Sequence, residues 1–163
     1  MGRLITFRFI WTDAWMRIDR GYYCKLHKFK NGNVSIRGLA NEEYFEINLY
    51  GIENLFIKDL ESIGIGEWNQ KFYHNPYVLD GNMWRLNLAY DCTDIHAEGM
   101  NGYPKTFLQY LDLMHNKYGM PKAEIEDPQR ISSLLKDIEI TELTNTMFSS
   151  YYMRNIERGY RIS

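Results

Sequence analysis

The sequence is poor in cysteine and has no long apolar run. Its two cysteines, Cys24 and Cys92, are too few for a disulfide framework and lack metal-binding spacing, which favours a reducing compartment. No apolar stretch approaches the roughly 18 residues that a membrane-spanning helix needs. The first residues, MGRLITFRFIW, lack the apolar segment of a signal peptide. We therefore expect a cytoplasmic protein with no membrane partner.

Sequence signatures of enzymes are also missing. The chain has no G-x-S-x-G, H-E-x-x-H or C-x-x-C pattern and no paired carboxylates spaced for acid–base work. The segment from Gly99 to Pro104 matches neither the P-loop nor the dinucleotide fingerprint, and is typical of a structural bend. We predict no catalytic residue, no metal ligand and no cofactor, so the sequence favours a protein without enzyme activity.

What the sequence contains is typical of a globular domain with unevenly distributed charge. Its 163 residues are 45% apolar, 25% charged and 15% aromatic. Residues 1–40 hold eight Lys/Arg against two Asp, whereas residues 41–140 hold 17 acids against eight bases. This asymmetry either steers a charged partner or lets the two regions neutralise each other within one sheet.

Alternating apolar residues predict strands in the first 50 residues. Leu4 to Trp11 and Tyr44 to Tyr50 place bulky side chains at every second position, as half-buried strands do. Between them, Tyr22 to Lys30 and Asn33 to Leu39 flank Asn31-Gly32, which is a strong hairpin signal.

A two-residue turn at Asn31-Gly32 would set the register of that hairpin. It opposes Phe29 to Val34 and His27 to Ile36 on one face. The other face then carries three basic residues, namely Lys28, Lys30 and Arg37. Basic and aromatic side chains together on a sheet bind single-stranded nucleic acid, although the overall pI of about 6.1 is low for such a domain.

A second hairpin is predicted from Trp84 to Glu98. Pairing Tyr90 with Ile95 around a four-residue loop, Asp91 to Asp94, gives one face that is apolar throughout. The opposite face is polar, and its residues include Arg85, Asn87, His96 and Glu98.

Asp94, His96 and Glu98, beside Arg85, form the most site-like cluster. A metal site needs donors within about 2.0–2.6 Å of one ion, but alternate strand residues lie about 6.6–6.8 Å apart. Two of them could chelate by leaning together, with a third ligand from elsewhere. The alternative interpretation is a solvated polar face.

Helical spacing appears in the second half of the chain. It predicts helices from Ile52 to Ile63, from Pro104 to Tyr118, and from Pro128 to Ile138 with Asp127 as N-cap. His115 lies on an apolar face, which is typical of a hydrogen-bonded core histidine. We also expect a helix in the tail, Glu139 to Ser163.

These elements predict an α+β fold, a mostly antiparallel β-sheet with two to four α-helices packed on one face. We expect a single domain over 1–163. It comprises a strand-rich part (1–50), a helix–hairpin–helix part (51–118) and a helical C-terminal part (119–163).

One module of the chain is similar to a module of small uncharacterised bacterial proteins. The pattern W…DGxxWxL…GxNxYP covers about a third of the chain, and no known activity accompanies it. The matching residues here are Trp68, Asp80, Gly81, Trp84, Leu86, Tyr90, Gly99, Asn101, Tyr103 and Pro104.

Three functional hypotheses follow from the sequence. The first is a non-catalytic protein-binding module of bacterial or phage origin, of the inhibitor or immunity type, because aromatics are abundant and the middle of the chain is acidic. The second is a binder of single-stranded nucleic acid through Lys28, Lys30 and Arg37. The third is a metal-dependent hydrolase that uses Asp94, His96 and Glu98. The sequence sets neither the partner nor the oligomeric state.

Overall fold

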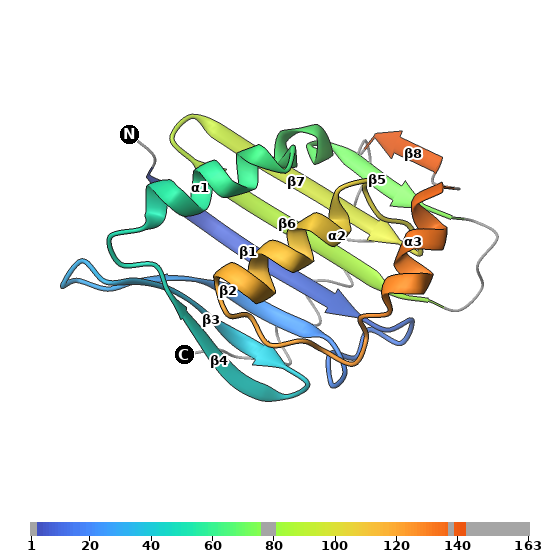
Figure 1. Ribbon diagram of the computed structural model, residues 1–163, viewed down its shortest axis with the longest axis horizontal. Helices are drawn as coiled ribbons and strands as arrows, with labels where there is room; N and C mark the ends of the chain where they lie inside the picture. Colours follow the sequence, from blue (N-terminus) through green and yellow to red (C-terminus); the bar gives the residue numbers. More distant parts are fainter. Residues whose placement is uncertain (1–2, 76–80, 137–138, 143–163) are drawn as a thin grey trace.

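A computed structural model describes residues 3–75, 81–136 and 139–142. Within these residues the chain folds into one eight-stranded sheet with helices on one of its faces (Figure 1). Asp80, which belongs to the W…DGxxWxL…GxNxYP module, lies outside the described residues, as does most of the predicted tail helix (residues 143–163).

The sheet is antiparallel except at one pair of strands. Its order is β4-β3-β2-β1-β6-β7-β5-β8, and only β5 and β7 run parallel among the described strands. The strands are β1 Leu4–Thr12, β2 Tyr22–Lys28, β3 Val34–Ala40, β4 Glu43–Asn48, β5 Lys71–His74, β6 Met83–Tyr90, β7 Thr93–Met100 and β8 Glu139–Glu142.

The helices form a single layer over the sheet (Figure 1). They are α1 Glu53–Ser62, the 3-10 turn η1 Ile65–Trp68, α2 Phe107–Asp112, the π-helical turn η2 Leu113–Lys117 that continues α2, and α3 Pro128–Lys136. The predicted α+β class is therefore confirmed. No helix among the described residues has both the length and the apolar character to cross a membrane.

Aromatic rings fill the space between the two layers. Phe107 of α2 is fully buried and lies 4.8 to 6.5 Å, centroid to centroid, from six other rings. These rings belong to Phe9, Trp11, Trp68, Trp84, Tyr103 and Tyr110. Much of the high aromatic content therefore serves the core.

The described glycines of the W…DGxxWxL…GxNxYP module make room for its larger side chains. The Trp84 indole lies across Gly99 and donates a hydrogen bond to the Gly102 carbonyl oxygen at 2.9 Å. A Cβ atom at position 99 would lie 1.9 Å from the indole nitrogen, so only glycine fits there. Asn101 similarly fills the space beside Gly81, where a Cβ would lie 1.1 Å from its Oδ1. The spacing of this module is therefore explained by packing, since Gly99 leaves room for Trp84 and Gly81 leaves room for Asn101.

The β6–β7 hairpin has the predicted faces but not the predicted register. Tyr90 pairs with Thr93 and Leu88 with Ile95, because the loop has two residues instead of four. Asp91, with φ of 48°, makes the tight turn. A shift of two residues preserves the faces, since side chains alternate with period two.

The β2–β3 hairpin differs from its predicted register by one residue. Phe29 N–H donates to the Asn33 carbonyl at 2.9 Å and thereby closes a longer loop, so Lys28 pairs with Val34. An odd shift moves every side chain of one strand to the other face. Lys28 consequently faces the helices.

Three further predictions need correction. The helix after Tyr103 begins at Phe107, because Pro104 starts a preceding turn in which Phe107 N–H donates to the Pro104 carbonyl. Lys71–His74, where the sequence predicted no element, is the strand β5. Glu139–Glu142, expected as helix, pairs with β5 as strand β8, since tertiary pairing overrides a weak helical pattern.

Phe107→Ala tests the aromatic layer. It should lower the free energy of unfolding by about 3–5 kcal/mol, the usual effect of removing a buried phenylalanine ring. Urea unfolding followed by tryptophan fluorescence measures the change. Tyr50→Ala is the control, because Tyr50 is 64% exposed and should change stability by about 0.5 kcal/mol or less. Similar effects of the two substitutions would contradict the packing described.

Candidate functional site

The cluster predicted at Asp94, His96 and Glu98 does not assemble around one point. His96 contacts Asp94 (Nε2 to Oδ1, 3.0 Å) and Asn87 (Nδ1 to Oδ1, 2.7 Å). Glu98 is only 3% exposed and instead faces Arg85, whose Nε lies 3.4 Å from its Oε1. The four candidate residues share one face as predicted, but they form separate pairs. No group of three His, Cys, Asp or Glu residues suitable for a metal exists in the described part of the chain.

The structure separates the predicted nucleic-acid residues Lys28, Lys30 and Arg37. Lys28 faces the helices and lies 3.9 Å from Glu53 of α1. Arg37 lies on the opposite face, where its Nε is 2.5 Å from Glu46 Oε2. Lys30 is exposed in the turn. The prediction that these three share a face is wrong, because it assumed a two-residue turn.

A buried network around His115 was only partly foreseen. The core histidine was expected, but its partner Glu126 lies in the extended segment after η2, which no local pattern connects to it. His115 Nε2 lies 2.5 Å from Glu126 Oε1, and Nδ1 lies 2.7 Å from the Met120 carbonyl oxygen. The same carboxylate accepts hydrogen bonds from the Ala123 N–H at 2.7 Å and from the Tyr22 hydroxyl.

This geometry favours the doubly protonated form of His115. Both ring nitrogens face oxygen acceptors, so each must carry a hydrogen. Burial alone would lower the pKa of His115, but hydrogen bonds to Glu126 and Met120 and the Glu126 charge raise it above its ordinary value, against an opposing effect of Lys122. The pKa of Tyr22 is also raised, by burial and by Glu126. The network therefore contains a charged pair, His115 of η2 with Glu126, and Tyr22 connects this pair to β2.

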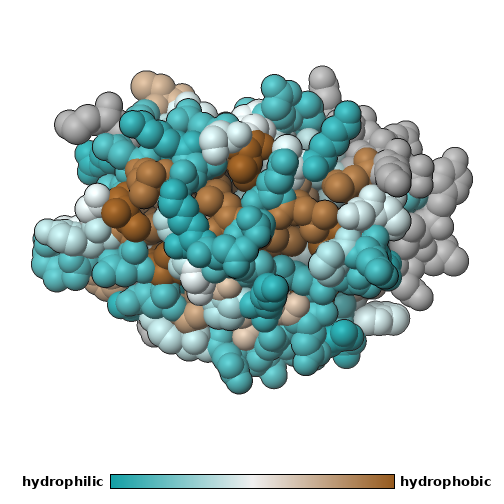
Figure 2. All heavy atoms as spheres, in the orientation of Figure 1, coloured by the Kyte–Doolittle hydropathy of each residue, from teal (hydrophilic) through white to brown (hydrophobic). Residues whose placement is uncertain are grey.

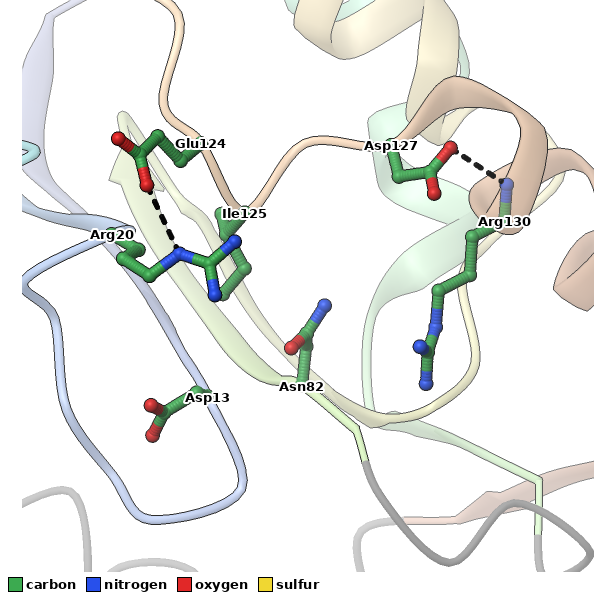
Figure 3. Close-up of a pocket in the computed structure, with 7 residues that line it drawn as sticks. All are labelled: Asp13, Arg20, Asn82, Glu124, Ile125, Asp127 and Arg130. Atoms are coloured by element: carbon green, nitrogen blue, oxygen red, sulfur yellow. Dashed lines mark hydrogen bonds and ion pairs between the residues drawn. The ribbon is translucent and has the colours of Figure 1, made fainter.

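A polar hollow of about 230 Å³ opens at one end of the sheet (Figure 3). Arg20 and Arg130 direct their guanidinium groups toward it, with Asn82 between them. The acids around it already have partners: Glu124 lies 3.1 Å from Arg20, and Asp127 accepts the backbone N–H groups of Gln129 and Arg130 at the start of α3. The third carboxylate of the lining, Asp13, is also engaged, since it lies 2.8 Å from Arg17 Nε and accepts the Trp15 backbone N–H.

A more apolar groove of about 650 Å³ lies beside the end of α1 and along α2 and η2. Its lining residues are Ile63, Leu108, Gln109, Asp112, Leu113, Asn116 and Lys117. Figure 2 shows apolar side chains reaching the surface of this helical face among hydrophilic ones.

Asp59 of α1 fixes the spacing of the two helices beside the groove. It lies 2.8 Å from Lys117 Nζ and accepts a hydrogen bond from the Tyr118 hydroxyl at 2.5 Å. Partial burial alone would raise the pKa of Asp59, but these two hydrogen bonds and the Lys117 charge lower it. The ion pair between Asp59 of α1 and Lys117 of η2 therefore forms one boundary of the groove.

Comparison with known proteins yields no relative. No protein-family model matches the sequence, and neither the curated proteins nor the solved structures contain a match. Functional inference therefore rests on the geometry of the described residues.

The His115–Glu126 pair predicts a loss of stability at alkaline pH. A histidine whose pKa is raised by folding stabilises the folded state fully below its unfolded-state pKa of about 6.5. That contribution disappears as the pH rises through the higher folded-state value. The free energy of unfolding, measured with urea at a series of pH values, should thus fall as the pH rises above about 6.5.

The variant His115→Gln isolates this effect. It should be less stable at the acidic end of the range and should lack the alkaline decline, because glutamine does not titrate. His27→Gln is the control, because the pKa of His27 is lowered by burial and by Lys25 and Arg37. A decline that persists unchanged in His115→Gln would refute the assignment.

Proposed function

We propose that the protein is a non-catalytic interaction module that binds a partner protein through the groove beside α1 and α2. The observation that carries this proposal is the apolar groove on the helical layer, where Leu108 and Leu113 remain partly exposed. An apolar surface rimmed by polar residues is characteristic of a protein-binding site.

The charges around the groove favour a basic partner. Lys117 is neutralised by Asp59, which leaves Asp112 as the remaining charge of the lining. In helix α1, Glu53 lies 3.9 Å from Lys28, and Glu61 balances the charge of Lys58. The complementary ligand is an amphipathic helix that inserts apolar residues into the groove and places Lys or Arg at its rim.

An inhibitor or immunity protein of a bacterial or phage system would have these properties. Such a protein acts by covering a surface of its target and needs no reacting groups of its own. The action would take place in the cytoplasm, which the free thiols of Cys24 and Cys92 favour.

Site-specific photo-crosslinking in cells of the source organism tests the proposal. A photoreactive amino acid at Gln109, which is exposed and lines the groove, should form a discrete adduct with one protein. The same amino acid at Glu43, exposed on the edge strand β4, is the positional control and should form none.

The crosslinked protein is then purified and titrated calorimetrically against two variants. Leu108→Asp should weaken binding about thirtyfold, the effect of losing roughly 2 kcal/mol at an interface hot spot. Ile5→Asp alters an apolar residue that is 52% exposed outside the groove, and should bind like the unmodified protein. Equal affinities of the two variants, or adducts from Glu43 alone, would overturn the proposal.

A further inference from the structure

The chain contains two Asn-Gly dipeptides, and the structure places them in opposite surroundings. Asn31-Gly32 lies in the turn between β2 and β3, where every residue from 28 to 33 is exposed. Asn101-Gly102 lies in the bend after β7, where both residues are buried and Asn101 is only 6% exposed. Asparagine is a thermolabile residue, and a following glycine makes it more reactive, because no side chain hinders the approach of the glycine nitrogen to the asparagine carboxamide.

The turn at Asn31 leaves the reacting groups open to water. A Cβ built on Gly32 would meet no atom within 4 Å outside the adjoining residues, so no other part of the protein obstructs the Gly32 nitrogen. Backbone hydrogen bonds hold the turn, from Phe29 N–H to the Asn33 carbonyl at 2.9 Å and from Gly32 N–H to the Phe29 carbonyl at 3.0 Å. The second bond must open before the Gly32 nitrogen reacts, and openings of an exposed loop cost little free energy.

The backbone of Asn33 prepares the Asn31 carboxamide for attack. Asn33 N–H donates to Asn31 Oδ1 at 3.0 Å, as asparagine side chains in turns commonly accept from the residue two positions on. When a nucleophile adds to Cγ of Asn31, negative charge develops on Oδ1. A donor already directed at that oxygen stabilises the charge. The contact that shapes the turn therefore also favours the reaction.

Asn101 lies in surroundings that oppose the same reaction. Its Oδ1 also accepts a backbone N–H, from Asn82 at 2.9 Å, but the side chain is enclosed. Gly102 packs against the Tyr73 backbone, whose carbonyl oxygen would lie 2.9 Å from a Cβ at position 102. The Gly102 carbonyl also accepts the Trp84 indole N–H. The Gly102 nitrogen therefore reaches the carboxamide only after the core opens at this place.

We propose that Asn31 is a site of spontaneous deamidation in the folded protein. The Gly32 nitrogen gives its proton to hydroxide and forms a bond to Cγ of Asn31, while the Cγ–Nδ2 bond breaks and ammonia leaves with a proton from water. The product is a cyclic imide. Water then adds to either carbonyl group of the ring and breaks its bond to nitrogen, which yields aspartate or isoaspartate without any change of oxidation state.

Both products change the chemistry of the turn. Each places a carboxylate beside Lys30, where the amide was neutral. Isoaspartate also carries its Cβ in the main chain, so the turn becomes longer and the bond from Phe29 to Asn33 must shift. The turn lies near the start of α1, since Lys28 is 3.9 Å from Glu53, whereas the groove lies beside the end of α1. The modification is therefore independent of partner binding in the groove.

Peptide mass spectrometry of the folded, full-length protein tests the proposal. During incubation at mildly alkaline pH, the tryptic peptide 31–37 should gain about 1 Da, the difference between an amide and a carboxyl group. An isoaspartyl methyltransferase should label part of this product. The rate should rise with pH, because hydroxide removes the Gly32 proton. The peptide that contains Asn101 should react at least about tenfold more slowly, since a buried segment opens more rarely than an exposed turn.

Asn31→Gln is the matched control. Its longer side chain would need a larger ring, so peptide 31–37 should keep its mass while the rate at Asn101 stays unchanged. In urea, which removes the folded surroundings, the rates at Asn31 and Asn101 should become similar. Equal rates at the two positions in the folded protein would overturn the proposal. So would a stable Asn31 in the folded protein when a synthetic peptide of residues 28–35 deamidates under the same conditions, because the turn would then protect it.

Discussion

The contact of Phe107 with the aromatic rings of the sheet is the interaction on which the rest of the structure depends. It places α2 over Trp11 and Trp84 at centroid distances of 5.3 and 5.1 Å. Because Phe107, Tyr110 and Met114 turn inward and are fully buried, Leu108 and Leu113 are left partly exposed beside α1. The groove is therefore a consequence of how the core is packed.

The two faces of the sheet carry different kinds of side chain. The helical layer covers one face with apolar contacts and adds acidic residues of its own. On the other face, Ile18 from the segment after β1 packs on Ile10, Tyr23 and Met83, while Arg8, Lys25 and Arg37 occupy the adjoining positions. The uneven charge of the sequence is compensated in part by pairs between its basic and acidic regions, such as Lys28 with Glu53 and Arg37 with Glu46.

Local patterns predicted most elements of the fold, because period two and helical spacing are properties of a short segment. They predicted the N-cap Asp127, whose carboxylate accepts the backbone N–H groups of Gln129 and Arg130. They did not predict the loop lengths at Asn31-Gly32 and Asp91, because the length of a loop depends on which strand positions become buried. The strand pairs β5–β7 and β5–β8 were also missed, since they join segments far apart in sequence.

Whether the residues of a predicted site share one face of the sheet depended on these strand registers. Asp94, His96 and Glu98 were correctly placed on one face, because a shift of two residues preserves the faces. Lys28 was placed on the wrong face by a shift of one residue, because the loop between β2 and β3 is longer than predicted. The most direct test of the account is a nuclear Overhauser spectrum of the labelled protein. We predict cross-peaks from the Phe107 ring to the indole protons of both Trp11 and Trp84; a Phe107 ring without contacts to either indole would contradict it.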